Sequence, residues 1–179
     1  MKSNTKLHLL KLITASLFTA IIAVLSQISI ITPVGIPITF QVFAIALCGY
    51  ILGVKWGFGS VLAYILLGIV GLPVFSGFKG GIGVLFELTG GYIIGFIPLV
   101  LFCGLAKHFK RKFVAVAISF IGLFLCHAIG IVVLSLISNT PLVSALVSIY
   151  VPLTVKDIIF QSIAYFLATY INKKTNFLP

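Results

Sequence analysis

The 179-residue chain has only two acidic residues, and each stands close to a lysine in the sequence. Asp157 directly follows Lys156, and Glu87 follows Lys79 in a glycine-rich segment. A carboxylate accepts hydrogen bonds from N–H groups, and an ammonium group pairs with an anionic group of a ligand. Asp157 and Lys156 are therefore candidate ligand-binding residues. The alternative for Asp157 is capping of the helix that begins near Pro152.

Residues 73–91 read PVFSGFKGGIGVLFELTGG, a long glycine-rich segment between apolar runs. Glycine permits positive φ and close approach of the backbone to a ligand, and free N–H groups at the start of the next helix favour an anion. A flexible external loop is the alternative interpretation. The candidate ligand-binding residues of this segment and the helix start that follows it are Lys79, Gly80, Gly81, Thr89, Gly91 and Tyr92.

Two further polar residues, Gln41 and His127, lie inside apolar runs. The Gln41 amide can donate and accept, which suits a ligand with polar heteroatoms, and an interhelical hydrogen bond explains it equally well. We expect His127 to be packed or bonded between helices rather than to be a ligand contact.

The sequence contains no convincing set of catalytic residues. We expect no histidine to pair with either acid, and the His, Cys and carboxylate residues are too few on one face for a metal site. No GxxxxGK[ST] motif occurs, so we predict no ATP site in this chain. We therefore expect a protein that is not an enzyme and that carries no metal and no cofactor.

Composition determines which elements must position these residues. The chain is 61% hydrophobic and 8% charged, with a mean hydropathy of +1.30. A soluble domain could not cover that much apolar surface with so few polar side chains, so lipid must surround most of the protein. Long unbroken apolar runs favour helices over the alternating strands of a β-barrel. The fold class is therefore an all-α integral membrane protein.

A membrane-spanning helix needs roughly 20 mostly apolar residues. We predict one membrane domain over residues 1–179, with an outer binding loop at 73–91. Residues 139–152 are too short to span and too apolar for an ordinary loop, which favours an interfacial or re-entrant segment. The six predicted transmembrane helices cover residues 7–31, 39–53, 56–72, 89–106, 113–138 and 152–172.

The basic residues predict the orientation of these helices. All but two of the 12 basic residues fall at the termini and at the second and fourth connections. In a chain that crosses the membrane six times, these segments all lie on the same side. By the positive-inside rule this side is cytoplasmic, with both termini inside. The exceptions, Lys79 and Lys156, lie on the opposite face with both acids. The net charge of +10 therefore indicates membrane orientation rather than binding of nucleic acid.

Small residues recur along the first predicted helix, at Ala15, Thr19 and Ala23, with Ser16 and Ala20 beside them. This spacing lets another helix approach closely. A face that docks on a partner protein and packing within the bundle are equally good interpretations.

Four features carry a resemblance to a known family: GLPVFSGFKGG (71–81), TGGYIIGF (89–96), ITFQ (38–41) and the spacing from Pro152 to Asp157. In these motifs the chain resembles the BioY family, the biotin-specific substrate-binding components (S components) of energy-coupling-factor (ECF) transporters. Two departures stand out. Glu87 and Leu88 replace a common Gly-Pro, and Phe160 stands where a lysine often follows the aspartate, so Lys156 is the candidate to supply that charge.

The resemblance implies a six-helix bundle in the cell membrane, with a ligand site near the outer face. It also implies that the first helix docks on a transmembrane coupling protein and that two cytoplasmic ATPases supply energy. The implied ligand is biotin, whose ureido N–H groups suit Asp157 and whose carboxylate suits Lys156 or Lys79.

Three other functions are compatible with the residues. The same fold could bind another vitamin or small heterocycle. A membrane enzyme acting on a lipid or polyisoprenoid would need a carboxylate pair, for which Glu87 and Asp157 are the two residues available. A structural partner subunit would bind no ligand.

Overall fold

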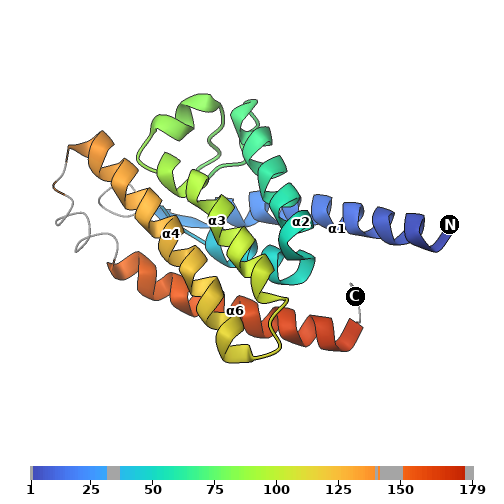
Figure 1. Cartoon of the computed structure of the whole chain (residues 1–179). Helices are drawn as coiled ribbons and strands as arrows, with labels where there is room; N and C mark the ends of the chain where they lie inside the picture. Colours follow the sequence, from blue (N-terminus) through green and yellow to red (C-terminus); the bar gives the residue numbers. More distant parts are fainter. Residues whose placement is uncertain (1, 32–36, 140, 142–150, 176–179) are drawn as a thin grey trace.

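The computed structural model describes residues 2–31, 37–139, 141 and 151–175 (Figure 1). Most of the predicted interfacial or re-entrant segment 139–152 lies outside these residues. The elements in chain order are α1 (Lys2–Gln27), β1 (Ser29–Ile31), β2 (Pro37–Thr39), α2 (Gln41–Ile69), the short 3₁₀ helix η1 (Ile82–Phe86), α3 (Gly90–Ala106), α4 (Lys112–Ser138) and α6 (Val151–Thr175).

The first helix is shorter at its C-terminal end than the predicted 7–31, because α1 ends at Gln27. The prediction was wrong for the residues that follow, which form β1 and pair antiparallel with β2, Ser29 opposite Thr39. β-Branched isoleucines on both strands favour this extended conformation, and Pro37 is tolerated because it stands at the first position of a short edge strand. The hairpin places Thr39 directly before α2.

A break at Gly53 divides α2 where the sequence predicted two helices, 39–53 and 56–72. Gly53 has φ 74° and ψ −174°, a conformation that glycine adopts without steric cost. Near the break, the Lys107 ammonium donates a hydrogen bond of 3.3 Å to the carbonyl oxygen of Ile51. The two halves of α2 therefore run in different directions, as Figure 1 shows.

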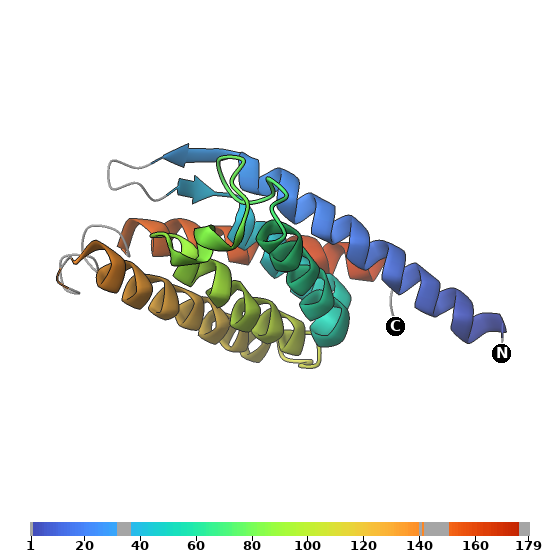
Figure 2. The same ribbon diagram turned by 90° about the horizontal axis from the view of Figure 1, so that it is seen from above.

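Helix α3 lies between α2 and α4, and glycines allow the close approach (Figures 1 and 2). A Cβ atom on Gly95 would stand 2.8 Å from the Cα atom of Cys126 on α4, and one on Gly104 would stand 2.6 Å from the backbone nitrogen of Val54 on α2. Helix α6 packs mainly on α2. The predicted helices 89–106, 113–138 and 152–172 correspond to α3, α4 and α6.

The small-residue stripe of α1 faces α2 within the chain. Ser60 of α2 donates its hydroxyl to the carbonyl oxygen of Ala15 at 2.7 Å, and the Thr19 hydroxyl donates to the carbonyl oxygen of Ser60 at 3.0 Å. Ala15 and Thr19 are buried, and Ala23 is partly buried against the core. Of the two interpretations of this stripe, packing within the bundle is the one that the structure shows for Ala15 and Thr19.

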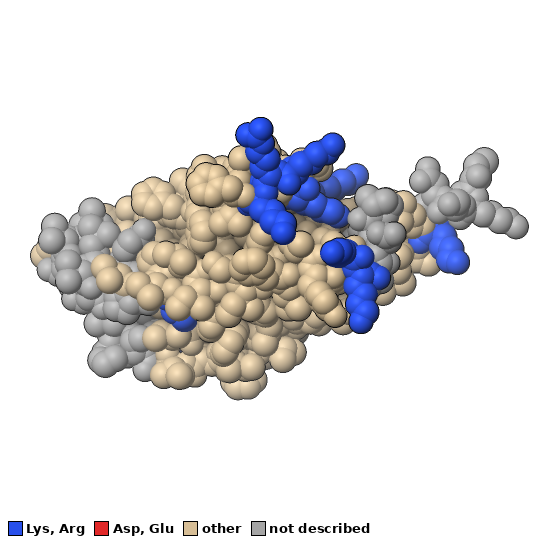
Figure 3. Space-filling view, turned by 90° about the horizontal axis from the view of Figure 1, so that it is seen from below, with Lys and Arg blue, Asp and Glu red and all other residues tan. Residues whose placement is uncertain are grey.

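Three described helices are long and apolar enough to cross a membrane: residues Thr5–Gln27 of α1, all of α2, and α4. Basic side chains gather toward the half of the molecule that holds both termini (Figures 1 and 3). Partial burial and the charge of Lys11 lower the pKa of Lys107, so cations from different helices meet there. This gathering agrees with one basic membrane face.

We expect Gly95→Ala to destabilise the protein, because the added methyl group would collide with the backbone of Cys126. Overpacking of this kind costs roughly 1–3 kcal/mol and outweighs the gain in helix propensity. Thermal unfolding in detergent measures the effect. Gly59→Ala is the matched control, since a Cβ atom there meets nothing within 4 Å, and equal melting temperatures of the two variants would contradict the proposed α3–α4 contact.

Candidate functional site

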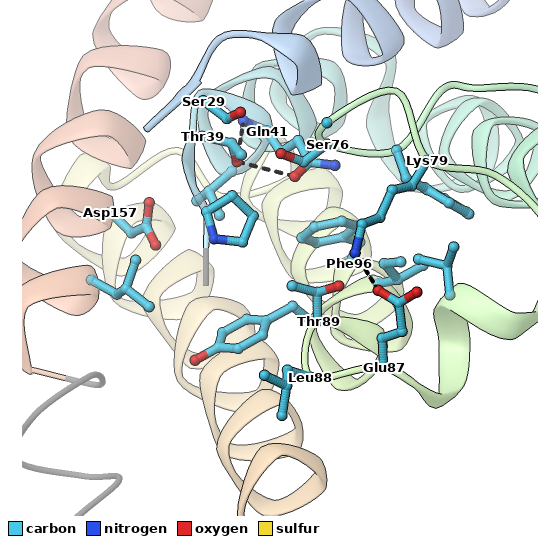
Figure 4. Close-up of a pocket in the computed structure, with 18 of the residues that line it drawn as sticks. Ser29, Thr39, Gln41, Ser76, Lys79, Glu87, Leu88, Thr89, Phe96 and Asp157 are labelled. Carbon is cyan, nitrogen blue, oxygen red and sulfur yellow. Dashed lines mark hydrogen bonds and ion pairs between the residues drawn. The ribbon is translucent and has the colours of Figure 1, made fainter. Parts of the chain in front are cut away.

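A cavity of about 510 Å³ opens where the hairpin, the 73–89 segment and the first turns of α2, α3 and α6 converge (Figure 4). Its volume lies in the range of small-molecule sites, roughly 300–1,000 Å³. Polar groups line both of its ends and apolar side chains line the middle. The lining includes Ser29, Pro37, Thr39, Gln41, Val42, Phe75, Ser76, Lys79, Val84, Glu87, Leu88, Thr89, Tyr92, Ile93, Phe96, Ile137, Leu153, Lys156 and Asp157.

At one end the carboxylate of Asp157 is 3% exposed and stands between two nitrogens. The Lys156 ammonium lies 2.7 Å from Oδ1, and Nε2 of His127 lies 3.2 Å from Oδ2, so the expectation that no histidine pairs with either acid was wrong. A buried carboxylate is tolerated only when it is paired, which these contacts provide. Within the described part of the chain Oδ1 accepts no aligned hydrogen bond, so it remains an acceptor for a ligand N–H group.

Lys156 is held over the same end of the cavity by three contacts. Its ammonium contacts Asp157, donates to the carbonyl oxygen of Thr39 at 3.0 Å, and lies 5.4 Å from the centroid of the Phe160 ring. Lys156 and Phe160 share a helix face because they are four residues apart. The Phe160 ring stacks on Phe40 at 4.8 Å. Phe160 thus supports the ammonium of Lys156 instead of supplying a charge.

The other end of the cavity carries the second ion pair. The ammonium of Lys79 lies 2.5 Å from Oε2 of Glu87, and both side chains are about half exposed, at 53% and 45%. In Figure 4 this pair and Asp157 stand on opposite sides of the cavity. Exposed ion pairs contribute only about 0–1 kcal/mol, so Lys79 can change its partner at little cost.

Gly80 and Gly81 do not line the cavity but shape the loop around it. A Cβ atom on Gly80 would stand 2.4 Å from the carbonyl oxygen of Leu72. Gly81 has φ 96° and donates its backbone N–H to Gly68 at 2.7 Å. These glycines therefore let the loop fold back over the end of α2, which brings Lys79 to the cavity.

Gln27 at the end of α1 holds this loop, a role that no local sequence pattern indicates. Its side-chain amide donates to the carbonyl oxygens of Val74 and Phe75 at 3.2 and 3.1 Å, and its Oε1 accepts from the backbone N–H of Phe78 at 2.9 Å. Ser26 adds a hydrogen bond of 2.6 Å to the same Val74 carbonyl. The first part of the loop is thus attached to α1.

Gln41 both lines the cavity and forms internal hydrogen bonds, so the two interpretations of this residue are compatible. Its amide nitrogen donates to the Tyr64 hydroxyl at 2.7 Å, and its Oε1 accepts from the Thr39 hydroxyl at 3.0 Å. Tyr64 in turn donates to the carbonyl oxygen of Val74 at 3.2 Å. This chain of hydrogen bonds joins both halves of α2 to the loop.

The residues predicted at the start of α3 have two different roles: some line the cavity and one packs against α4. Thr89 and Tyr92 line the cavity. Gly91 does not, because a Cβ atom there would stand 2.6 Å from Cβ of Val133 on α4.

Ser76 is a lining residue that sequence reasoning missed, although it lies within the GLPVFSGFKGG motif. Its buried hydroxyl has no hydrogen-bond partner among the described residues.

The arrangement suits the binding of a small molecule. No group of three His, Cys, Asp or Glu residues that could hold a metal ion occurs in the part of the chain that the structure describes. Asp157 offers an acceptor for N–H donors, Lys79 offers a cation, and Phe75 and Phe96 line the apolar part of the cavity. The matching ligand has N–H donors at one end, an apolar middle and an anionic group at the other end.

Comparison with known proteins gives one consistent relationship. The family described as the BioY family matches residues 1–177. The chain is 46% identical over 127 residues to the biotin transporter BioY of Thermotoga maritima, covering 70% of this chain and 74% of that protein. It is 33% identical over 172 residues to the probable biotin transporter BioY of Bacillus subtilis, covering 90% of each. A crystal structure of the S-component for biotin from an ECF-type ABC transporter matches with a TM-score of 0.86 and 28% identity, over 97% of this chain and 95% of that one.

We expect Gln27→Leu to release the loop from α1, because it removes the donors and the acceptor that hold residues 74–78. Hydrogen–deuterium exchange of peptides that include Phe78 should accelerate by about tenfold or more, as expected when hydrogen bonds that hold a segment are lost. Ser16→Ala is the control on the same helix, since its hydroxyl donates to the carbonyl oxygen of Leu12 within that helix. Unchanged exchange in Gln27→Leu would show that the loop is held by other contacts.

Proposed function

The chain belongs to the BioY family, and on this premise we propose that it is the biotin-binding membrane subunit, or S component, of an ECF-type vitamin uptake transporter. A protein of this kind is a multi-pass cell membrane protein and not an enzyme. The single observation that carries the proposal is the cavity itself, with a buried acceptor at one end, a lysine at the other and an apolar wall between them.

Biotin has the polarity that this cavity requires. Its ureido ring carries two N–H groups, for which Oδ1 of Asp157 is the acceptor we propose. The bicyclic ring and the aliphatic chain would pack against apolar and aromatic walls that include Phe75, Tyr92 and Phe96.

We propose Lys79 as the partner of the biotin carboxylate. The ammonium of Lys156 already contacts Asp157 and the carbonyl oxygen of Thr39, at the buried end of the cavity. Lys79 stands at the opposite end, and its exposed pair with Glu87 exchanges at little cost. The ligand carboxylate would therefore join or replace Glu87.

The proposed topology has six transmembrane helices, with the two halves of α2 as separate spans and both termini cytoplasmic. The positive-inside rule supports this orientation, because the basic side chains gather toward the half of the molecule that holds both termini. The cavity would then face the outside. The break at Gly53 supports the division of α2.

For transport we propose a transmembrane coupling protein and two cytoplasmic ATPases as partners, with no ATP site, metal or other cofactor in this chain. The bilayer is the other surrounding partner, and no nucleic acid is involved. Because Ala15 and Thr19 are buried against α2, the surface of α1 that is open to the coupling protein includes the exposed Ser16 and Ala20.

The binding proposal predicts that Asp157→Asn loses far more affinity than Glu87→Gln. Loss of the charged acceptor should weaken binding by about 10- to 100-fold, whereas loss of an exposed rim charge should change it by about threefold or less. Saturation binding of labelled biotin to detergent-purified protein measures both. Absence of saturable binding in the wild type would overturn the function, and a thermal-shift panel of vitamins would then identify another ligand. Equal effects would show that Asp157 is not the principal acid.

The assignment of Lys79 predicts a dependence on the ligand carboxylate. Lys79→Met should weaken binding of biotin by about 3- to 10-fold but change binding of biotin amide by less than about twofold, because the amide has no charge to pair. Lys110→Met, at the basic end, is the matched control. If both ligands lose affinity equally in Lys79→Met, the lysine does not contact the carboxylate.

A further inference from the structure

His127 is a buried polar residue of α4 that the proposed ligand contacts do not use. Its side chain is 2% exposed, and it does not line the cavity. Nε2 lies 3.2 Å from Oδ2 of Asp157, which does line the cavity. The histidine therefore stands behind the carboxylate, on the side away from the proposed ligand.

The chemistry of this contact requires a proton on the histidine. An ionised carboxylate can only accept, so an attractive contact at 3.2 Å needs the N–H on Nε2, although this N–H is not aligned on Oδ2 as in a regular hydrogen bond. The other carboxylate oxygen, Oδ1, lies next to Lys156 and accepts no aligned hydrogen bond within the described residues. Each carboxylate oxygen thus has one close nitrogen, Oδ1 that of Lys156 and Oδ2 that of His127.

The histidine ring is itself fixed by its neighbours. Tyr92 of α3 packs edge-on against it, with ring centroids 5.7 Å apart and an interplanar angle of 85°. The Tyr92 ring occupies the space where a Cβ atom on Gly130 of α4 would stand, 2.6 Å away. Because Tyr92 also lines the cavity, the orientation of His127 is set by a residue of the ligand wall.

We infer that His127 is the positioning residue for Asp157: it holds Oδ2 from α4 so that Oδ1 faces the ligand N–H groups. Helix α6 packs mainly on α2, and His127 supplies a polar contact between its first turns and α4. Without this contact the carboxylate would be free to rotate toward Lys156 alone. The inference rests on the proposed function for its ligand, but the His127–Asp157 contact is testable without any ligand.

Binding of labelled biotin to three variants tests the positioning role. His127→Phe keeps a planar ring without a donor and should weaken binding by about 10- to 100-fold, the range expected when a polar contact to a buried charged group is lost. His127→Gln places an amide N–H near the position of Nε2 and should remain within about threefold of the wild type. His108→Phe, on the exposed basic flank, should bind as the wild type does. Wild-type affinity in His127→Phe, or an equal loss in the Gln and Phe variants, would overturn the inference.

A ligand-free measurement separates this inference from the biotin proposal. In protein labelled with ¹⁵N-histidine, the Nε2 resonance that disappears in His127→Gln belongs to His127. We expect Asp157→Asn to shift that resonance and to leave those of His8 and His108 in place. An unmoved resonance would overturn the inference whether or not biotin binds. Failure of the wild type to bind biotin, with the resonance shifted, would reject the ligand and keep the His127–Asp157 contact.

Discussion

A carboxylate buried among apolar helices is the constraint on which the rest of the structure depends. Removing the Asp157 charge from water costs several kcal/mol unless other groups compensate for it. The compensation comes from Lys156 on α6 and His127 on α4, and Lys156 is tied to the hairpin through the carbonyl oxygen of Thr39. The first turns of α6, the middle of α4 and the end of β2 therefore have to meet at one point, and the cavity forms beside it.

The two ion pairs of the cavity differ in the permanence of their contacts. The Asp157 pair is buried and has contacts from two helices, so its geometry is set before a ligand arrives. The Lys79–Glu87 pair is half exposed and stands on a loop, so it is weak and can exchange. A fixed acceptor at one end and an exchangeable cation at the other allow a ligand to be oriented at the buried end and held at the open end.

Local patterns predicted most of the helices and the ends of the cavity. Apolar runs bounded by prolines and lysines indicated α3, α4 and α6. Because the chain has so few acids, Asp157 was a candidate ligand-binding residue. The hairpin was missed because its strands are too short for an alternating pattern. Gln27 and Ser76 were missed because their roles depend on contacts with segments far away in the sequence or on a cavity that only the fold creates. His127 was correctly expected to be packed between helices, but its contact with Asp157 joins residues of different helices and has no local signal.

The break at Gly53 gives α2 the shape of a V, and the hydrogen bond between Gln41 and Tyr64 joins the two arms near their open ends. Each arm is about 17 Å long from Gly53 to the bonded residue, at a rise of 1.5 Å per residue. The two arms of α2 and this hydrogen bond form a closed triangle. The angle between the arms can therefore change only if the hydrogen bond is lost or one arm bends. The vertex lies near Lys107, and Gln41 at the opposite side of the triangle lines the cavity, so a displacement of the vertex would be felt at the ligand wall.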